Sequence, residues 1–279
     1  MIKILERTRI RRIKIFSCIM FLSAFFMVSC TTISTFELDS NWRSREVVVD
    51  GNNNEWLGAM LYFEGEYISV GIRNDESFFY MCMIAEEPII RAQVMRQGFT
   101  VWFDPDGGDE KTFGIKFPIG MQAIGTPEKM IPRRERESEP DPEEMQRAFR
   151  RLLAELEILG PGKDEQARLK VEEAKGIDIV LNISGEMLVY ELKVPLLHNE
   201  QHPYAVGAEV GNLIGVGLEI PKLDMSAIRD RMGGRRPGGT GMPGGGRIGG
   251  MGMRGARGLW MPRGIKLWMA IQLAAGQSQ

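Results

Sequence analysis

Three tryptophans in this sequence have the surroundings that sugar binding requires. A sugar stacks the C–H face of its ring on a flat aromatic side chain, and its hydroxyl groups need polar partners nearby. Trp102 lies on the polar face of a predicted strand, Trp56 follows three asparagines in a polar turn, and Trp268 shares a face with Lys266. Tryptophan is also frequently buried, so each could instead pack in a core. The candidate carbohydrate-binding residues are Trp56, Trp102 and Trp268.

A cluster of carboxylates directly follows Trp102. Asp104, Asp106 and Asp109 lie within a short stretch that also contains Gly107 and Gly108. Closely spaced carboxylate oxygens are the ligands that Ca²⁺ prefers, although this spacing is not that of an EF-hand. Asp and Gly are also the residues that hairpin turns favour, so a hydrated turn explains the stretch without an ion. Asp104, Asp106 and Asp109 are the candidate ligands of a structural calcium ion.

No arrangement of residues indicates catalysis. His198 and His202 flank Glu200, but a zinc-protease motif requires Glu directly after the first His. The sequence contains no serine nucleophile elbow, no phosphate-binding glycine loop after a strand and no cysteine-rich metal cluster. The two histidines share one predicted loop, so they also make a poor pair of heme ligands. The sequence therefore predicts a protein that is not an enzyme.

Short strands with period-two alternation must position these residues. The composition, 43% hydrophobic and 26% charged over 279 residues, is sufficient for one large buried core. Turn residues such as Asn74-Asp75 and Ser184-Gly185-Glu186 separate neighbouring runs. Many half-buried strands joined by hairpins predict an all-β fold, an antiparallel β-sandwich, over residues 46–275. The alternating runs begin at residues Ile68, Phe99, Phe113, Ile177, Leu188, Ile214 and Ile265.

The pattern changes to helical spacing between residues 126 and 175. Asp141 is a candidate N-cap, Pro142 fits the first helical position, and Glu144 completes a capping box. Apolar residues then recur at intervals of three and four as far as Leu156, and the helix is predicted to stop at Gly160-Pro161-Gly162. A shorter charged helix is predicted over residues 164–175. Residues 126–175 are thus expected to form a helical insertion.

The first 29 residues have the features of an export signal. Six basic side chains precede an apolar run from Ile15 to Val28, which is short for a bilayer span of about 20 residues. A single anchoring helix is the alternative. The ending Met27-Val28-Ser29-Cys30 resembles a bacterial lipoprotein signal, in which the cysteine is lipidated and becomes the new N-terminus. Residues 1–29 are the predicted signal peptide, Cys30 is the lipidation site, and residues 30–45 form a tether.

Removal of the signal makes the mature chain acidic. Residues 1–29 contain six basic and one acidic residue, so 29 basic and 36 acidic residues remain, for a net charge of about −7. Such a chain is a poor ligand for nucleic acid. Cys82 is then the only cysteine besides Cys30, which excludes an internal disulfide. Its apolar neighbours predict a buried, unreactive thiol.

Residues 231–263 form a low-complexity segment. Of the 33 glycines, 13 lie between Gly233 and Gly258, and no Asp or Glu occurs after Asp230. Glycine-rich sequence cannot offset its ordering entropy by burial, which predicts a disordered loop before the last strand. Its arginines would suit contact with anionic lipid, acidic glycan or an envelope protein. A loop that arginine merely keeps soluble is equally consistent, while export argues against RNA.

The order of several short motifs resembles one known family. These are Val47-Val48-Val49-Asp50-Gly51 before Glu55-Trp56, then Gly71-Ile72-Arg73-Asn74-Asp75, Gly98-Phe99-Thr100-Val101-Trp102 and Tyr190-Glu191-Leu192-Lys193-Val194-Pro195. In this order the chain resembles the family 9 carbohydrate-binding modules (CBM9) and their DOMON-like relatives. The resemblance implies a bacterial exported β-sandwich that binds sugar between aromatic side chains and that sometimes contains calcium. The family's paired binding aromatics do not align with particular residues here.

These observations together predict a lipid-anchored module of the bacterial cell envelope, sorted to the outer membrane because Thr31 and not Asp follows Cys30. The predicted ligand is a carbohydrate, bound without catalysis. The alternative is a structural or assembly lipoprotein that has kept the sandwich, has lost sugar binding and contacts a protein partner or lipid. Burial of all three candidate tryptophans would favour that alternative.

Overall fold

The computed structural model describes residues 36–121, 123, 142–160, 162, 165–222 and 264–276. The predicted signal peptide, the lipidation site Cys30 and the loop at residues 231–263 lie outside the described residues, as do residues 124–141 of the predicted helical insertion. The described residues all belong to one compact unit.

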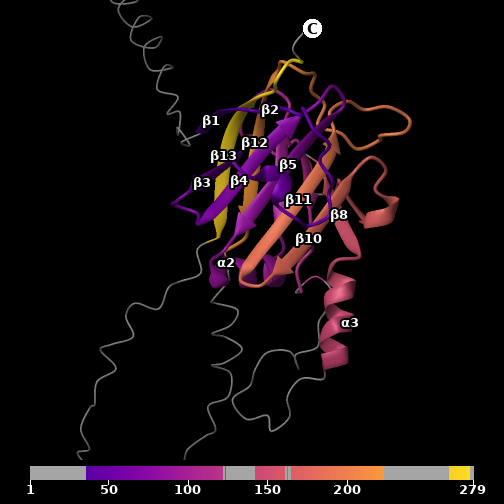
Figure 1. Ribbon diagram of the computed structural model, residues 1–279. Helices are drawn as coiled ribbons and strands as arrows, with labels where there is room; N and C mark the ends of the chain where they lie inside the picture. The colour runs from indigo at the N-terminus through magenta and orange to yellow at the C-terminus, as the bar shows by residue number, and fades with distance from the viewer. Residues whose placement is uncertain are drawn as a thin grey trace, which may run out of the picture. The chain divides into compact units, whose positions relative to one another are not determined.

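Two β-sheets build this unit, and they are packed face to face (Figure 1). The seven-stranded sheet has the order β1-β13-β12-β6-β7-β8-β9, and the six-stranded sheet has the order β10-β11-β5-β4-β2 with β3 paired to β4. The strands of the first sheet are β1 (Phe36–Asp39), β13 (Ile265–Gln272), β12 (Leu213–Ile220), β6 (Thr100–Asp104), β7 (Phe113–Lys116), β8 (Glu155–Leu159) and β9 (Gln166–Lys170). Those of the second are β10 (Asp178–Ser184), β11 (Met187–Pro195), β5 (Phe78–Ala85), β4 (Ile68–Asn74), β2 (Asn41–Trp42) and β3 (Met60–Phe63).

The core lies between the sheets and follows from the period-two pattern. Alternate residues of β6 and β12, such as Val101 and Val216, pack against Met81 of β5 and Tyr190 of β11, and all four are buried. Apolar area removed from water in this way is the main stabilising contribution. The predicted all-β sandwich is therefore confirmed.

Two strand pairs are parallel, in contrast to the predicted antiparallel pattern. β1 pairs parallel with β13, and β2 pairs parallel with β4. Both strands fall in residues 36–42, which the sequence assigned to the tether at residues 30–45. The folded domain therefore begins earlier than predicted. Leu38 shows why, because it packs against the core although its neighbours are polar.

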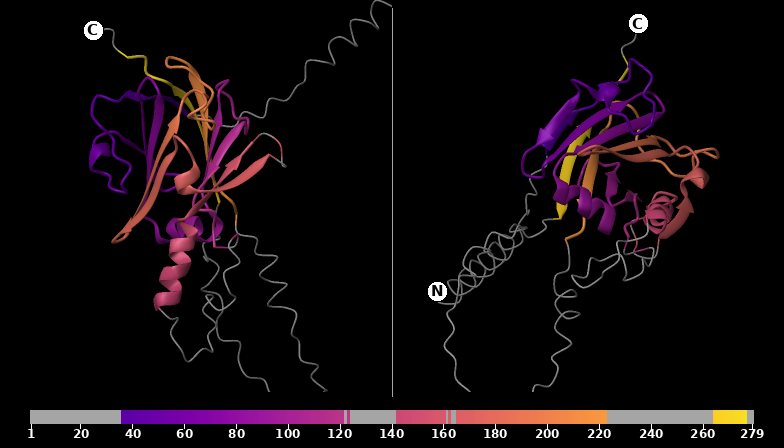
Figure 2. Two further views of the ribbon diagram at one scale, coloured as in Figure 1. Left: turned by 90° about the vertical axis from the view of Figure 1, so that its right-hand side faces the viewer. Right: turned by 60° about the horizontal axis from the view of Figure 1, so that its bottom comes forward.

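The predicted helical insertion is only partly helical. α3 (Pro142–Leu152) is a helix and projects from one end of the sandwich (Figure 2). Leu156, expected in the same helix, is a buried residue of β8. The second predicted helix is wrong, because β9 and the short 3-10 helix η4 (Val171–Glu173) occupy that stretch. β9 pairs with β8 and alternates, with Ala167 and Leu169 against the core and charged residues outside.

One helix was not predicted. α2 (Pro88–Gln97) has proline at its start, and its C-cap Gly98 has φ +87°. Proline at the first helical position and glycine at the end are recognised boundary signals. The segment between β5 and β6 carries both signals, but its apolar periodicity is weak.

A short segment covers the outer face of the six-stranded sheet. Residues 47–56, which include the 3-10 helix η2 (Asn54–Trp56), cross this sheet from β4 to β10. Val47 and Trp56 pack there with Tyr80, Cys82 and Val189 in a second apolar cluster. Cys82 is fully buried and unpaired, as predicted, and burial raises the pKa of its thiol far above the ordinary value.

Candidate functional site

Trp56 is buried and anchors the segment that contains it. Its indole Nε1 donates a hydrogen bond of 2.7 Å to Oε1 of Glu191, a fully buried carboxylate on β11. The backbone N–H groups of Gly51 and Asp50 donate to the other carboxylate oxygen at 2.7 and 3.1 Å. The guanidinium of Arg73 lies 5.3 Å from the centre of the Trp56 ring. Trp56 therefore holds residues 47–56 against β5 and β11, and its ring has no exposed face on which a sugar could stack.

Trp102 and Trp268 lie on the outer face of the seven-stranded sheet, where their rings pack on glycines of neighbouring strands. Trp102 is paired in register with Gly114 and Gly217, and Gly217 is paired with Trp268. A Cβ atom at Gly114 would lie 2.6 Å from the Trp102 ring, and one at Gly217 would lie 2.7 Å from the Trp268 ring. Each indole therefore covers a glycine of a neighbouring strand.

Neither of these two indoles has a free face. Trp102 is 9% exposed and Trp268 is 3% exposed. The Trp102 Nε1 donates to Glu219 at 2.8 Å, and the ammonium group of Lys111 lies over its ring at 4.9 Å. Stacking of a sugar needs an exposed ring, so none of the three predicted tryptophans meets this geometric requirement in the structure. Trp56 and Trp102 are held by acidic partners and Trp268 covers a glycine, and the sequence alone does not place these partners opposite them.

The carboxylates proposed for calcium do not converge on one point. Asp104 is buried, and its two oxygens accept hydrogen bonds from the backbone N–H groups of Asp106 and Glu110 at 3.1 and 2.9 Å. The side chains of Asp106 and Asp109 are exposed. Among the described residues no group of three or more His, Cys, Asp or Glu side chains could hold a metal ion. Asp104 therefore folds the loop after β6 through its own hydrogen bonds.

This role predicts a stability effect for Asp104. Asp104→Ala leaves two amides without their acceptor and is expected to lower the free energy of unfolding by about 2 kcal/mol. Asp109→Ala, at an exposed position in the same loop, is the matched control and should change it by less than about 0.5 kcal/mol. Thermal unfolding in calcium and in chelator should give the same melting temperature. A calcium-dependent rise that disappears in Asp104→Ala would instead demonstrate a calcium site.

The two histidines lie in a tight loop after β11 and do not form a pair. Asn199 and His202 exchange two backbone hydrogen bonds of 3.1 Å, which closes a turn. His202 packs against the ring of Phe78 at 5.4 Å. His198 points the other way, and its Nδ1 lies 3.1 Å from the carbonyl oxygen of Pro203. Because a carbonyl can only accept, Nδ1 carries the hydrogen and Nε2 of the neutral ring is an acceptor.

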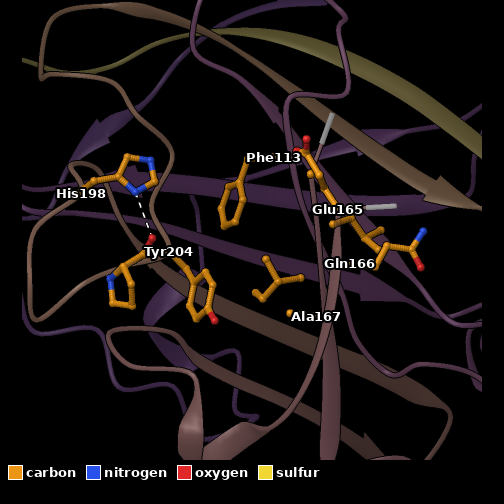
Figure 3. Close-up of a pocket in the computed structure, with 10 residues that line it drawn as sticks. Phe113, Glu165, Gln166, Ala167, His198 and Tyr204 are labelled. Carbon is orange, nitrogen blue, oxygen red and sulfur yellow. Dashed lines mark hydrogen bonds between the residues drawn. The ribbon is translucent and has the colours of Figure 1, made fainter. Parts of the chain in front are cut away.

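A cleft lies where this loop faces the β8–β9 hairpin. Its volume is about 380 Å³, within the range of about 300–1,000 Å³ that is usual for small-molecule sites. The rings of Phe113 and Tyr204 lie between His198 on one side and Glu165 and Gln166 on the other (Figure 3). The cleft thus combines two aromatic rings with imidazole, carboxylate and amide groups.

The core holds the two rings in place. Phe113 of β7 stacks on buried Phe103, with ring centres 5.8 Å apart and planes 24° apart. Tyr204 is half-buried and packs against the same core. Glu165 is fixed at the end of the hairpin, where its carbonyl oxygen accepts a 2.7 Å hydrogen bond from the Gly160 N–H. One wall of the cleft therefore comes from β7 and the β8–β9 hairpin, and the other comes from the hydrogen-bonded loop between β11 and β12.

Sequence reasoning missed this site. The sequence places His198 in a loop and excludes it from a zinc-protease motif, and it does not indicate Phe113, Glu165, Gln166 or Tyr204 as binding residues. The missed signal is the β8–β9 hairpin, since residues 164–175 were predicted to be helical. With those residues as an edge hairpin, Glu165 and Gln166 come to the same end of the sheet as Phe113.

Comparison with known proteins gives a likeness in structure but none in sequence. No protein-family profile matches the sequence, and no curated protein matches it. The structure is similar to a CBM9 module from Caldicellulosiruptor kristjanssonii in complex with glucose, at 8% identity and a TM-score of 0.37 over 68% of this chain and 81% of that one. The same module in complex with cellotriose gives 7% identity and a TM-score of 0.35, over 68% and 79% of the two chains. These values do not assign the chain to that family. In the described part of the chain no helix has the length and apolarity needed to cross a bilayer.

Proposed function

We propose that this protein is a non-catalytic carbohydrate-binding module of the bacterial cell envelope, held at the outer membrane by a lipid on Cys30. The observation that carries the proposal is the cleft, in which the rings of Phe113 and Tyr204 lie between His198 and Glu165 (Figure 3). The lipid anchor and the outer-membrane address rest on the N-terminal sequence.

The chemistry of the cleft suits a sugar. The exposed part of the Tyr204 ring provides an apolar surface for the C–H face of a pyranose, and the Tyr204 hydroxyl group adds a donor. Glu165 accepts hydrogen bonds from sugar hydroxyls, and so does Nε2 of His198, because its Nδ1 is engaged by Pro203. An aromatic surface beside convergent polar groups is the usual composition of a small-molecule site.

The same residues argue for binding without hydrolysis. Most glycosidases use two carboxyl groups that flank the scissile bond. Among the described residues that line the cleft, Glu165 is the one carboxylate. Of the described side chains, a sugar bound there would meet this one acidic group and no second one on the opposite side of the ring. The geometry therefore favours a module that recognises its ligand and leaves it intact.

Tyr204→Ala is expected to weaken sugar binding at least about tenfold, which corresponds to about 1.4 kcal/mol, because it removes the stacking surface. The measurement is calorimetric titration of the mature chain with mono- and oligosaccharides, in a detergent without a sugar headgroup. Tyr62→Ala is the matched control, since Tyr62 is 62% exposed on β3, an edge strand of the other sheet. Equal affinity in wild type and Tyr204→Ala would contradict the cleft as the site.

A second function has one observation in its favour. Trp56, Trp102 and Trp268 are all buried, as expected for an assembly lipoprotein that has lost sugar binding. Absence of binding to every sugar in a protein shown to be folded would select this role. Deletion of residues 231–263 would then test whether the arginine-rich loop provides the contact with a protein partner or anionic lipid.

A further inference from the structure

Exposed apolar side chains gather at one margin of the domain. Nine large apolar residues are exposed in the described part of the chain, and six of them lie between residues 36 and 67. Five surround β3, and we call this group the β3 edge: Phe36, Leu57, Leu61, Tyr62 and Tyr67. Their exposed fractions are 48, 73, 49, 62 and 40%. Clustered exposed apolar surface marks a contact with another apolar phase or partner.

The fold brings these residues to one place. Leu61 and Tyr62 are consecutive on β3, so they point to opposite faces of the strand. Leu57 precedes β3, and Tyr67 ends the turn that follows it. Phe36 at the start of β1 reaches this strand, because its ring lies edge-on to that of Phe63 at a centre distance of 5.2 Å. Figure 1 shows β3 at the margin of the six-stranded sheet, beside β1.

The backbone conformation of the turn after β3 does not favour a tyrosine at position 67. Its φ is +56°, the one positive value at a non-glycine residue in the described part of the chain. Its N–H donates a 2.8 Å hydrogen bond to the carbonyl oxygen of Phe63. Glycine or asparagine would adopt this left-handed conformation at lower cost. A tyrosine is therefore present in spite of the turn, which points to a role for its side chain.

The length of chain before β1 limits what can face this margin. Only six residue steps separate Cys30 from Phe36. A fully extended chain spans at most about 3.6 Å per residue, so Phe36 lies within about 20 Å of a lipid on Cys30. A tether this short can hold the margin around Phe36, which includes the β3 edge, at the headgroup layer.

We propose that the β3 edge docks in the interfacial layer of the membrane that holds the lipid anchor, an inference that rests on the proposed lipidation of Cys30. Tyrosine is enriched at membrane interfaces because its ring is apolar and its hydroxyl remains hydrated. Leu57 and Leu61 add apolar area beside the tyrosines. With β3 against the bilayer, the cleft at the β8–β9 edge of the other sheet points away from the membrane, toward a ligand.

The charges around the β3 edge determine which lipids it prefers. Glu37 and Glu64 are exposed at this margin. Acidic residues are repelled by anionic headgroups, so docking depends on apolar burial and not on electrostatic attraction. Docking is therefore expected not to weaken with added salt, and to be no stronger on membranes rich in phosphatidylglycerol than on membranes rich in phosphatidylethanolamine.

The test uses the lipidated mature protein, which begins at Cys30, in vesicles of phosphatidylethanolamine with a minor fraction of phosphatidylglycerol. Cys82 is fully buried and Cys30 is acylated, so a single introduced cysteine takes up an environment-sensitive fluorophore. Tyr62→Cys places the probe in the β3 edge. Glu186→Cys is the matched control, because Glu186 is exposed in the turn between β10 and β11, at the opposite edge of the same sheet.

The expected result is a blue-shifted emission at position 62 that shallow spin-labelled lipids quench, with no change at position 186. An unshifted probe at position 62 would overturn the docking proposal, and mass spectrometry showing acylated Cys30 in the same sample would leave the anchor intact. Absence of the acyl mass would overturn the anchor and the docking with it. A shift that depends on protein concentration and resists the lipid quenchers would overturn docking in favour of self-association through β3.

Discussion

Glu191→Ala is expected to lower the free energy of unfolding by about 3 kcal/mol. Glu191 is fully buried and accepts hydrogen bonds from Trp56 and from the N–H groups of Gly51 and Asp50. Alanine leaves all three donors without their acceptor beneath the segment at residues 47–56. An unpaired buried donor loses its hydration without compensation, so the cost exceeds the net contribution of an ordinary hydrogen bond.

Chemical denaturation checks this expectation. Trp56→Phe removes one donor and keeps the aromatic ring, so combining it with Glu191→Ala isolates the coupling between the two side chains. The double variant should be less destabilised than the sum of the single variants. If the two changes in the free energy of unfolding were strictly additive, or if Glu191→Ala lowered it by less than about 1 kcal/mol, the packing of residues 47–56 would not depend on this carboxylate.

The pH dependence of Glu191 has a defined sign. Burial raises the pKa of its carboxyl group, and the hydrogen bonds from Trp56, Gly51 and Asp50 oppose that rise. Between the ordinary pKa of glutamate and the raised one, the folded state holds a proton that the unfolded chain has released. The contribution of this group to stability is therefore complete below the ordinary pKa and is lost as pH increases through the raised pKa. Wild type should gain stability relative to Glu191→Gln as pH falls, whereas parallel profiles would contradict the shift.

Gly217→Val is expected to cost about 3 kcal/mol. Valine is favoured in strands, so substitution at an open strand position would be neutral or stabilising. Here a Cβ atom would lie 2.7 Å from two ring atoms of Trp268, and the indole is 3% exposed. The indole of Trp268, which comes from β13, would have to move away from Gly217 on β12. This movement would expose apolar area and disturb the strand pairing.

Gly65→Val is the matched control for this substitution. Gly65 lies in the turn after β3, and a Cβ atom added there meets no heavy atom within 4 Å. Its effect on thermal unfolding should stay within about 0.5 kcal/mol. The double variant Gly217→Val, Trp268→Ala should be less destabilised than the sum of the two single variants, because the smaller side chain removes the clash. Equal melting temperatures for Gly217→Val and wild type would show that the indole moves away without cost.

The sandwich could be predicted because apolar and polar residues alternate with period two along its strands. Val101 and Phe103 on β6, or Ile214 and Val216 on β12, mark the core face in the sequence. Residues 164–175 could not be assigned correctly in this way. Charged residues surround Ala167 and Leu169, and only pairing with β8 reveals which face is buried.

The candidate site could not be predicted for a similar reason, because its residues are brought together by strand pairing between distant parts of the sequence. The tryptophans have polar neighbours in sequence, but their partners in space are glycines and carboxylates of other strands. Trp102 covers Gly114, which is 12 positions away, and Trp56 binds Glu191, which is 135 positions away. The cleft combines Phe113, Glu165 and Tyr204, whose convergence depends on the β8–β9 hairpin.

The most direct test of the central claim is a sugar titration of the isotopically labelled protein followed by amide NMR shifts. The account predicts saturable shifts confined to the cleft around Phe113, Glu165, His198 and Tyr204, with no response near Trp56, Trp102 or Trp268 and none in the Tyr204→Ala variant. Shifts centred on the tryptophans, or no shift with any sugar in a folded protein, would contradict it.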